Sequence, residues 1–151
     1  HGARVILNPA PARELPDTLL RRVSVLTPNE IEAEALSGVK VRDPRSAEKA
    51  ARRLLQRGVE AVIVTLGARG ALAASAAGVE LVRGFRVRAV DTTAAGDVFN
   101  GALAVALGEG RPLREAVRFA NAAAAISVTR FGAQRSAPTR TEIEQFLSQA
   151  S

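Results

Sequence analysis

Hydrophobic residues in the first half of the chain occur in two patterns: short continuous runs, and positions spaced along one face of a helix. Short apolar runs are typical of buried strands, and a nearly continuous run indicates a strand covered on both faces. Apolar residues spaced along one helix face, with glycine directly after them, indicate helices that end at Gly38 and Gly58. The predicted elements of this half are strands over residues 3–8, 23–26 and 59–66 and helices over 29–36 and 46–56.

The second half is predicted to continue with a hairpin and then three helices. Residues 71–75 and 80–82 are expected to pair around Gly78, and residues 85–90 are expected to form a further strand. The predicted helices cover residues 97–107, 113–128 and 141–149. Strands that alternate with helices indicate a single α/β domain over residues 1–151, with a mostly parallel sheet flanked by helices on both faces and a short hairpin.

Composition narrows the class of protein. A hydrophobic share of 47% in 151 residues allows a packed core, and the absence of cysteine excludes disulfides and thiolate metal sites. No apolar run approaches the roughly 18 residues of a membrane span, and no secretory signal opens the chain. We therefore expect a cytoplasmic protein without a membrane partner. The chain begins at His1 and contains no methionine, which suggests a fragment.

The net charge of +6 raises the question of a nucleic-acid partner. The basic residues are scattered singly or in pairs such as Arg21-Arg22 and Arg52-Arg53, without interleaved aromatic residues. Proteins that bind nucleic acid usually gather their positive charge on one patch or stripe. We expect no nucleic-acid partner.

Candidate chemistry lies in the segment Asp91–Asp97, which leads from a predicted strand into a predicted helix. Small residues at positions 94 to 96 let the backbone approach a ligand, and the unpaired N–H groups of the helix start point toward the same place. This arrangement suits a phosphoryl group in transfer, and Asp97 can accept the proton of an attacking hydroxyl. Alternatively, the segment is a tight turn, and Asp97 is a first-turn acid favoured by the helix dipole.

The segment Asp91–Asp97, followed by Gly101-Ala102-Leu103, resembles the signature of the ribokinase-like carbohydrate kinases. Further segments resemble parts of the same family in the same order. They are Leu7–Ala12, the Asn-x-x-Glu motif in Thr27–Glu32, the nucleotide loop Thr65–Gly70, and the C-terminal stretches Phe119–Ala125 and Val128–Gln134. The likeness covers essentially the whole chain, and the loops are most similar to those of ribokinases.

The resemblance implies transfer of the γ-phosphoryl group of ATP to a primary hydroxyl of a small sugar. D-ribose, converted to D-ribose 5-phosphate, is the expected substrate. Asp97 would contact the sugar and act as the base, and the N–H groups of Ala95, Gly96 and Asp97 would form an anion hole. Deoxyribose or fructose as the sugar, or a truncated nucleotide-binding module without activity, are the alternatives.

The resemblance also implies a nucleotide site and a magnesium ion. The expected nucleotide contacts are Asn29, Thr65, Leu66, Gly67, Ala68, Arg69, Gly70, Gly96 and Asn121. Asn121 would reach the edge of adenine, where the family often has histidine, or it is a polar residue of an alanine-rich helix. Glu32 would orient Mg²⁺ through water. Asn29 and Glu32 are also spaced as a helix capping pair, and Gly67–Gly70 could be a plain turn.

A potassium ion beside the anion hole is the last cofactor that the resemblance implies. Its oxygen ligands would come from Asp91, Thr93, Ser127, Arg130, Gly132 and Ser136, with backbone carbonyls serving at Ser127 and Arg130. The ion would fix the shape of the loop.

Members of the family carry, before this segment, a sugar-binding region with a small lid, of comparable length. This chain lacks that region. We therefore expect the chain to be the C-terminal, nucleotide-binding half, with little or no activity by itself. The full-length enzyme is expected to be a homodimer.

Overall fold

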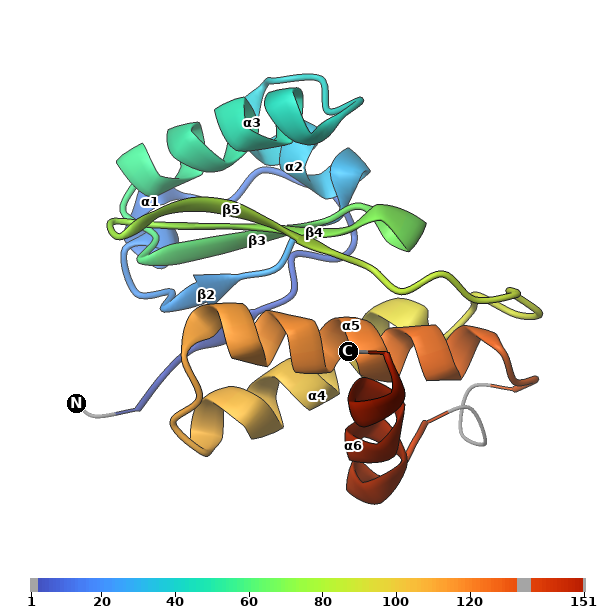
Figure 1. Cartoon of the computed structure of the whole chain (residues 1–151). Helices are drawn as coiled ribbons and strands as arrows, with labels where there is room; N and C mark the ends of the chain where they lie inside the picture. The colour runs from blue at the N-terminus through green and yellow to red at the C-terminus, as the bar shows by residue number, and fades with distance from the viewer. Residues whose placement is uncertain (1–2, 133–136, 151) are drawn as a thin grey trace. The chain divides into compact units, whose positions relative to one another are not determined.

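The computed structural model of the chain describes residues 3–132 and 137–150, and Figure 1 shows the order of its elements. The chain separates into two compact units. The first unit comprises the residues up to Leu66 together with Ala71–Leu81, and the second comprises Gly67–Gly70 together with the residues from Val82 onward. The prediction of one domain over the whole chain stays a prediction.

One five-stranded sheet organises the strands, in the order in which they occur along the chain. The strands are β1 (Ile6–Leu7), β2 (Val25–Leu26), β3 (Ala61–Thr65), β4 (Gly70–Ser75) and β5 (Gly78–Arg83). β1 pairs with β2 and β2 pairs with β3 in parallel, whereas β3 and β4 are antiparallel. The predicted fold class, a mostly parallel sheet with helices and a hairpin around Gly78, is confirmed.

The core of the first unit lies between the sheet and two helices, α2 (Glu30–Ser37) and α3 (Pro44–Gln56), which both contact β3. Val62 and Val64 of β3 and Leu54 of α3 are completely buried. α3 begins at a capping box in which Asp43 accepts the N–H of Ser46, followed by proline at the first helical position. Both signals explain why this helix begins at Pro44, two residues before the predicted start.

A short helix, α1 (Asp17–Leu20), was not expected from the sequence. It has one buried residue, Leu20, which is completely enclosed in the core of the first unit. Four residues are too few to show a helical period, so the pattern of hydrophobic positions carries no signal for this element.

Three helices build the second unit: α4 (Ala95–Gly108), α5 (Leu113–Val128) and α6 (Arg140–Gln149). α4 packs extensively against α5, and α6 also contacts α5 (Figure 1). Phe99 and Leu103 of α4 and Phe119 of α5 are buried. Alanines fill most of the remaining buried positions of α5, and such small side chains let neighbouring helices approach closely. No helix among the described residues is long and apolar enough to cross a membrane.

The strand predicted over residues 85–90 is wrong. Phe85 and Val87 are partly buried, and Arg86 and Arg88 are exposed, so these four side chains alternate. Among the described residues no strand pairs with this segment, because the sheet ends at β5. The ring of Phe85 instead meets that of Phe146 on α6 edge-on, at 5.1 Å. Alternation shows which side chains face inward, and helices can supply that interior as well as a neighbouring strand can.

Candidate functional site

The start of α4 leaves two backbone donors without an acceptor. Its N-cap residue is Ala94, which has no side chain to cap the helix. The N–H of Ala95 donates to the carbonyl of Thr92 at 3.2 Å. The N–H groups of Gly96 and Asp97 donate to no acceptor among the described residues. Of the three groups of the expected anion hole, two are therefore free to meet a ligand, and the third closes the turn.

Glycine at position 96 has no explanation in the fold. Gly96 does not have a positive φ, and a Cβ built on it meets nothing within 4 Å. Gly70 is different: its φ is +104°, and a Cβ there would lie 2.2 Å from the carbonyl oxygen of Val82. Since Cβ atoms of a helix tilt toward its N-terminus, a side chain at position 96 would enter the space before the open donors. The missing side chain keeps that space clear.

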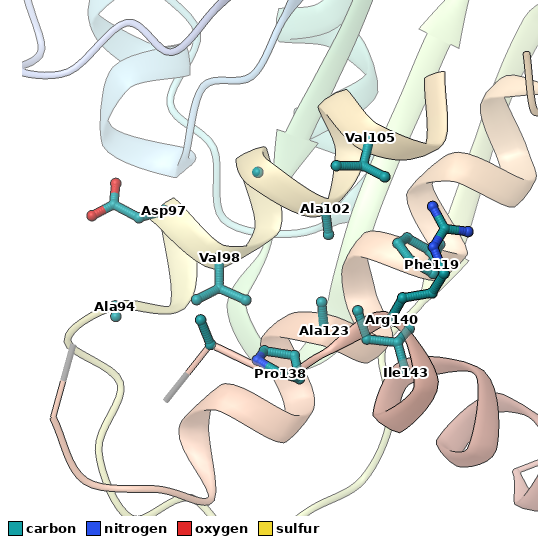
Figure 2. Close-up of a pocket in the computed structure, with 12 residues that line it drawn as sticks. Ala94, Asp97, Val98, Ala102, Val105, Phe119, Ala123, Pro138, Arg140 and Ile143 are labelled. Atoms are coloured by element: carbon teal, nitrogen blue, oxygen red, sulfur yellow. The ribbon is translucent and has the colours of Figure 1, made fainter. Parts of the chain in front are cut away.

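Asp97 is the third residue of α4 and is exposed. It lines one end of a groove of about 440 Å³ between α4, α5 and the start of α6. In Figure 2, Val98, Ala102 and Val105 follow Asp97 along α4, and Arg140 lies at the far end. Among the described residues that line the groove, Asp97 and Arg140 are the charged ones. The groove therefore offers a sugar very few hydrogen-bonding partners besides Asp97.

Three of the residues predicted to bind potassium lie together beside the start of α4. Oδ1 of Asp91 accepts the N–H and the hydroxyl of Thr93 at 2.9 and 2.5 Å, and Oδ2 accepts the N–H of Gly132 at 3.3 Å. The hydroxyl of Thr93, followed by the two N–H groups, holds the pKa of Asp91 below its usual value. The carboxylate of Asp91 therefore stays ionised at neutral pH.

The C-terminal end of α5 closes onto the same place. The carbonyl of Val128 accepts the N–H of Asp91 at 3.0 Å, and the carbonyl of Ser127 accepts the N–H of Arg130 at 3.1 Å. The hydroxyl of Ser127 is buried without a hydrogen-bond partner among the described residues. Ser136, the last predicted ligand, lies outside the described residues.

In the first unit, Asn29 and Glu32 form the capping pair that their spacing allows. The N–H of Glu32 donates to Oδ1 of Asn29 at 2.8 Å, and the N–H of Asn29 donates to Oε1 of Glu32 at 2.9 Å. The backbone of Asn29 also bridges to Thr65 at the end of β3. The described residues contain no group of three or more histidine, cysteine or acidic side chains that could hold a metal ion. A water-mediated contact of Glu32 with Mg²⁺ stays a prediction.

The predicted nucleotide loop is a tight connection rather than an open strand end. Leu66 is buried, Gly67–Arg69 forms the short 3₁₀ helix η1, and Gly70 begins β4. Asn121 is buried, and its amide nitrogen donates to the carbonyls of Val82 and Arg83 at 3.0 and 3.3 Å. These bonds fasten α5 to the end of β5, and a contact of Asn121 with adenine stays a prediction.

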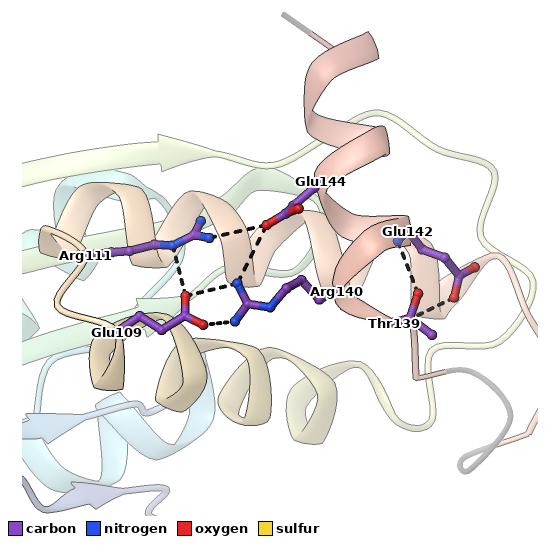
Figure 3. Close-up of polar contacts among 6 residues, drawn as sticks. All are labelled: Glu109, Arg111, Thr139, Arg140, Glu142 and Glu144. Atoms are coloured by element: carbon purple, nitrogen blue, oxygen red, sulfur yellow. Dashed lines mark hydrogen bonds and ion pairs between the residues drawn. The ribbon is translucent and has the colours of Figure 1, made fainter.

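Sequence reasoning missed the contacts that α6 makes. Figure 3 shows Arg140 and Glu144 of α6 beside Glu109 and Arg111 from the turn between α4 and α5. Glu142 of the same helix accepts from the guanidinium of Arg130. The motif Thr139-x-x-Glu142, a capping box, was the one available signal in the sequence. It marks the start of the helix but does not reveal the partners of its charges.

The sequence places this fold and this helix start within a class of enzymes. Residues 1–140 match the pfkB family of carbohydrate kinases, and the chain belongs to that family. Over 150 residues it is 51% identical to the ribokinase of Haemophilus influenzae, a match that covers 99% of this chain and 49% of that protein. The chain spans about half the length of the curated relatives it matches.

Solved structures agree with this family. The ribokinase of Thermotoga maritima superposes with a TM-score of 0.89 at 50% identity, over 98% of this chain and 50% of that one. The ribokinase of Arabidopsis thaliana, solved in complex with ribose and ATP, has a TM-score of 0.91 at 34% identity, over 97% of this chain and 48% of that one. The ribokinase-like fold expected from the motifs is therefore confirmed.

Proposed function

We propose that the chain is the nucleotide-binding and catalytic part of a kinase that transfers the γ-phosphoryl group of ATP to D-ribose, giving D-ribose 5-phosphate. The observation that carries the proposal is the start of α4, where two backbone donors without an acceptor lie beside the carboxylate of Asp97. Its similarity to ribokinases, one of them solved with ribose and ATP, supports both substrates.

The start of α4 holds the phosphoryl group during transfer. The N–H groups of Gly96 and Asp97 donate to its oxygens, and the positive end of the helix dipole favours the same negative charge. Donors fixed by a helix need no rearrangement as the charge of the transition state develops, and this makes them effective.

Asp97 accepts the proton of the attacking sugar hydroxyl. Its position in the first turn places the carboxylate next to the donors that hold the phosphoryl group, so the hydroxyl and the phosphorus can meet there. In a loose phosphoryl-transfer transition state, positioning of the attacking hydroxyl contributes more than its early deprotonation. Since the groove beside Asp97 is mostly apolar, we propose that other parts of the enzyme hold most of the sugar.

Magnesium and potassium complete the proposal. Mg²⁺, oriented by Glu32 through water, would neutralise charge on the phosphates of ATP; a solved E. coli structure with ATP and Mg²⁺ is 34% identical to this chain. Potassium would be held by oxygens of Asp91, Thr93, Ser127, Arg130, Gly132 and Ser136. The ionised carboxylate of Asp91, whose own N–H is bonded to the end of α5, fits a cation there.

Deoxyribose is the second candidate substrate, because the deoxyribokinase of Salmonella typhi is 40% identical over 98% of this chain. The test is ADP release by the natural polypeptide that carries this sequence, with D-ribose, 2-deoxyribose and D-fructose compared at equal concentrations. We expect the highest kcat/KM with D-ribose. A higher value with 2-deoxyribose would favour the second candidate, and the absence of sugar-dependent ADP release would contradict both.

A further inference from the structure

We propose that Arg130 and Glu142 are a positioning pair for the monovalent cation. Glu142 on α6 binds the guanidinium of Arg130 and thereby fixes residues 129–132, the cation segment, which contains the proposed potassium ligands Arg130 and Gly132. The side chains of the pair act from outside the coordination shell of the ion, of which the backbone carbonyl of Arg130 is a member, and they set the affinity for the ion. This inference rests on the potassium site of the proposed function.

The cation segment is held at both ends by hydrogen bonds. At its start, the N–H and the hydroxyl of Thr129 donate to the carbonyl of Ile126 at 3.1 and 2.6 Å. At its end, Gly132 donates to Asp91 and adopts a φ of +86°, a conformation that favours glycine. Between these ends, the side chain of Arg130 makes the contact that connects the segment to α6.

The carboxylate of Glu142 performs two tasks with its two oxygens. Oε1 accepts the N–H of Thr139 at 2.9 Å, and the N–H of Glu142 donates to the hydroxyl of Thr139 at 3.2 Å, so this half belongs to the cap of α6. Oε2 accepts from Nη2 of Arg130.

α6 has anchoring contacts that are independent of this pair: Ile143 is buried, and the ring of Phe146 meets that of Phe85 edge-on. Nη1 of Arg140 donates to Glu109 at 3.1 Å, and Arg111 lies 3.7 Å from Glu144 (Figure 3). The guanidinium of Arg111 also stacks over the ring of Phe119, 4.6 Å from its centroid. These contacts involve neither Arg130 nor Glu142.

Because the pair is partly exposed, a positioning role and a purely structural role predict different effects of losing it. The side chains of Arg130 and Glu142 are 33% and 38% exposed, and ion pairs this open to solvent contribute little to global stability. Residues just outside a metal's ligands, in contrast, typically change metal affinity about 10–100-fold when they are mutated. Loss of the pair should therefore change cation affinity much more than unfolding temperature.

The test is the variant Glu142→Gln in the 151-residue chain, because glutamine keeps the cap acceptor and loses the charge that binds Arg130. The unfolding midpoint is measured against KCl at constant ionic strength, with choline chloride as the balancing salt. We expect the midpoint of the unmodified chain to rise and saturate with potassium. Glu142→Gln should need about tenfold more potassium for half of that rise, with a nearly unchanged midpoint in choline chloride.

Two control variants separate the pair from the rest of α6. Glu144→Gln makes the same change on the same helix, two residues away, but breaks contacts with Arg111 and Arg140 instead. We expect its half-maximal potassium concentration to match that of the unmodified chain. Thr139→Ala weakens the cap and leaves the carboxylate of Glu142 in place, so it should lower the midpoint without changing the potassium requirement.

Three results would overturn the inference, and they differ in whether the proposed potassium site would also be wrong. If Glu142→Gln and the unmodified chain need the same potassium concentration, the positioning pair is wrong and the potassium site stands. If Glu144→Gln weakens potassium binding as much as Glu142→Gln, general docking of α6 is responsible. If potassium and choline have equal effects on the unmodified chain, the potassium site itself is wrong, and the pair has nothing to position.

Discussion

Each of the two units contains a helix that begins next to predicted site residues: α2 in the first unit and α4 in the second. The two helices differ in whether a side chain caps their first N–H groups. At α2, Asn29 and Glu32 exchange hydrogen bonds, so the N–H of Glu32 in the first turn has a side-chain acceptor. At α4, Ala94 offers no side-chain cap, and the donors of Gly96 and Asp97 stay open among the described residues. A capped start stabilises its helix, whereas an open start can bind an anion.

The backbone shows that the open start is built into the fold. The N-cap residues with a capping side chain, Asn29, Asp43 and Thr139, have ψ angles of −175°, 173° and 162°. This extended conformation points a short polar side chain at the N–H groups of the first turn. Ala94 has a ψ of 5°, so a polar side chain in its place would not point there. The comparison supports the proposed phosphoryl site at α4 and indicates helix stabilisation at α2.

The largest expected effect comes from supplying what the groove beside α4 lacks. Alone, the 151-residue chain should bind ATP weakly and transfer almost nothing to D-ribose, because Asp97 and Arg140 are the only charged side chains described along that groove. Holding reactants in line contributes roughly 7–11 kcal/mol, so adding the part of the Haemophilus influenzae ribokinase outside the match should raise transfer at least about a thousandfold. Calorimetry with ATP and a ribose-dependent coupled assay measure both quantities.

Turnover by the chain alone at about 1–100 s⁻¹, which is typical of kinases, would show that this chain already holds its sugar. A mixture with the same added part and the Asp97→Asn chain is the control, since it contains every component except the proposed base.

Asp97→Asn should have the next largest effect. Asparagine keeps the shape of the side chain and leaves the N–H groups of α4 in place, but it cannot accept the proton. We expect transfer in the completed enzyme to fall about 10²–10⁴-fold, as for removal of other general bases, while calorimetric ATP affinity changes little. The matched control is Glu115→Gln, which removes the first-turn acid of α5. An equal loss in both variants would mean that Asp97 acts only as a charge at a helix start.

Gly96→Ala should separate stability from activity. Alanine favours a helix over glycine by up to about 1 kcal/mol, and the structure has room for the methyl group, so the free energy of unfolding should rise. The same methyl group enters the space before the open donors, and transfer should fall by about tenfold or more, since a single such donor contributes 10²–10³-fold. Urea unfolding and the coupled assay give the two quantities.

Gly108→Ala is the control for that result, because Gly108 is the last residue of α4 and has equally open space. It should also raise the free energy of unfolding, without any loss of transfer. If Gly96→Ala retains full activity, the open start of α4 does not receive the phosphoryl group.

The sequence predicted elements whose signal is local. The apolar period revealed α3 and β3, and the motif Asp91–Asp97 correctly marked a turn into a helix. The sequence could not show that the N–H of Ala95 donates to the carbonyl of Thr92, because hydrogen bonding in a turn depends on the backbone angles. It also could not choose between the capping and magnesium interpretations of Glu32, since both require the same spacing.

Long-range contacts were beyond the sequence. A single sequence does not predict that Arg130 pairs with Glu142 or that Asn121 is buried against the end of β5. Residues 85–90 were predicted to form a strand, but hydrophobic positions do not reveal which element covers the inward side chains. At residues 85–90 the tertiary partner Phe146 decided the outcome.

The smallest expected effect is a change in the free energy of unfolding when the Asn29 cap of α2 is removed. Asn29→Ala removes the side chain that accepts the N–H of Glu32, and loss of such a cap typically costs about 1 kcal/mol. Ala94→Ser adds a hydroxyl at the equivalent position of α4, but the ψ of 5° directs it away from the first-turn donors, so no comparable gain should appear. Urea unfolding of both variants without nucleotide measures the two free energies. If Ala94→Ser stabilises the chain by as much as Asn29→Ala destabilises it, the start of α4 can be capped like any other helix. The open N–H groups of Gly96 and Asp97 would then be an ordinary vacant cap. The case for a phosphoryl site there would rest on the missing side chain at position 96 and on the carboxylate of Asp97 alone.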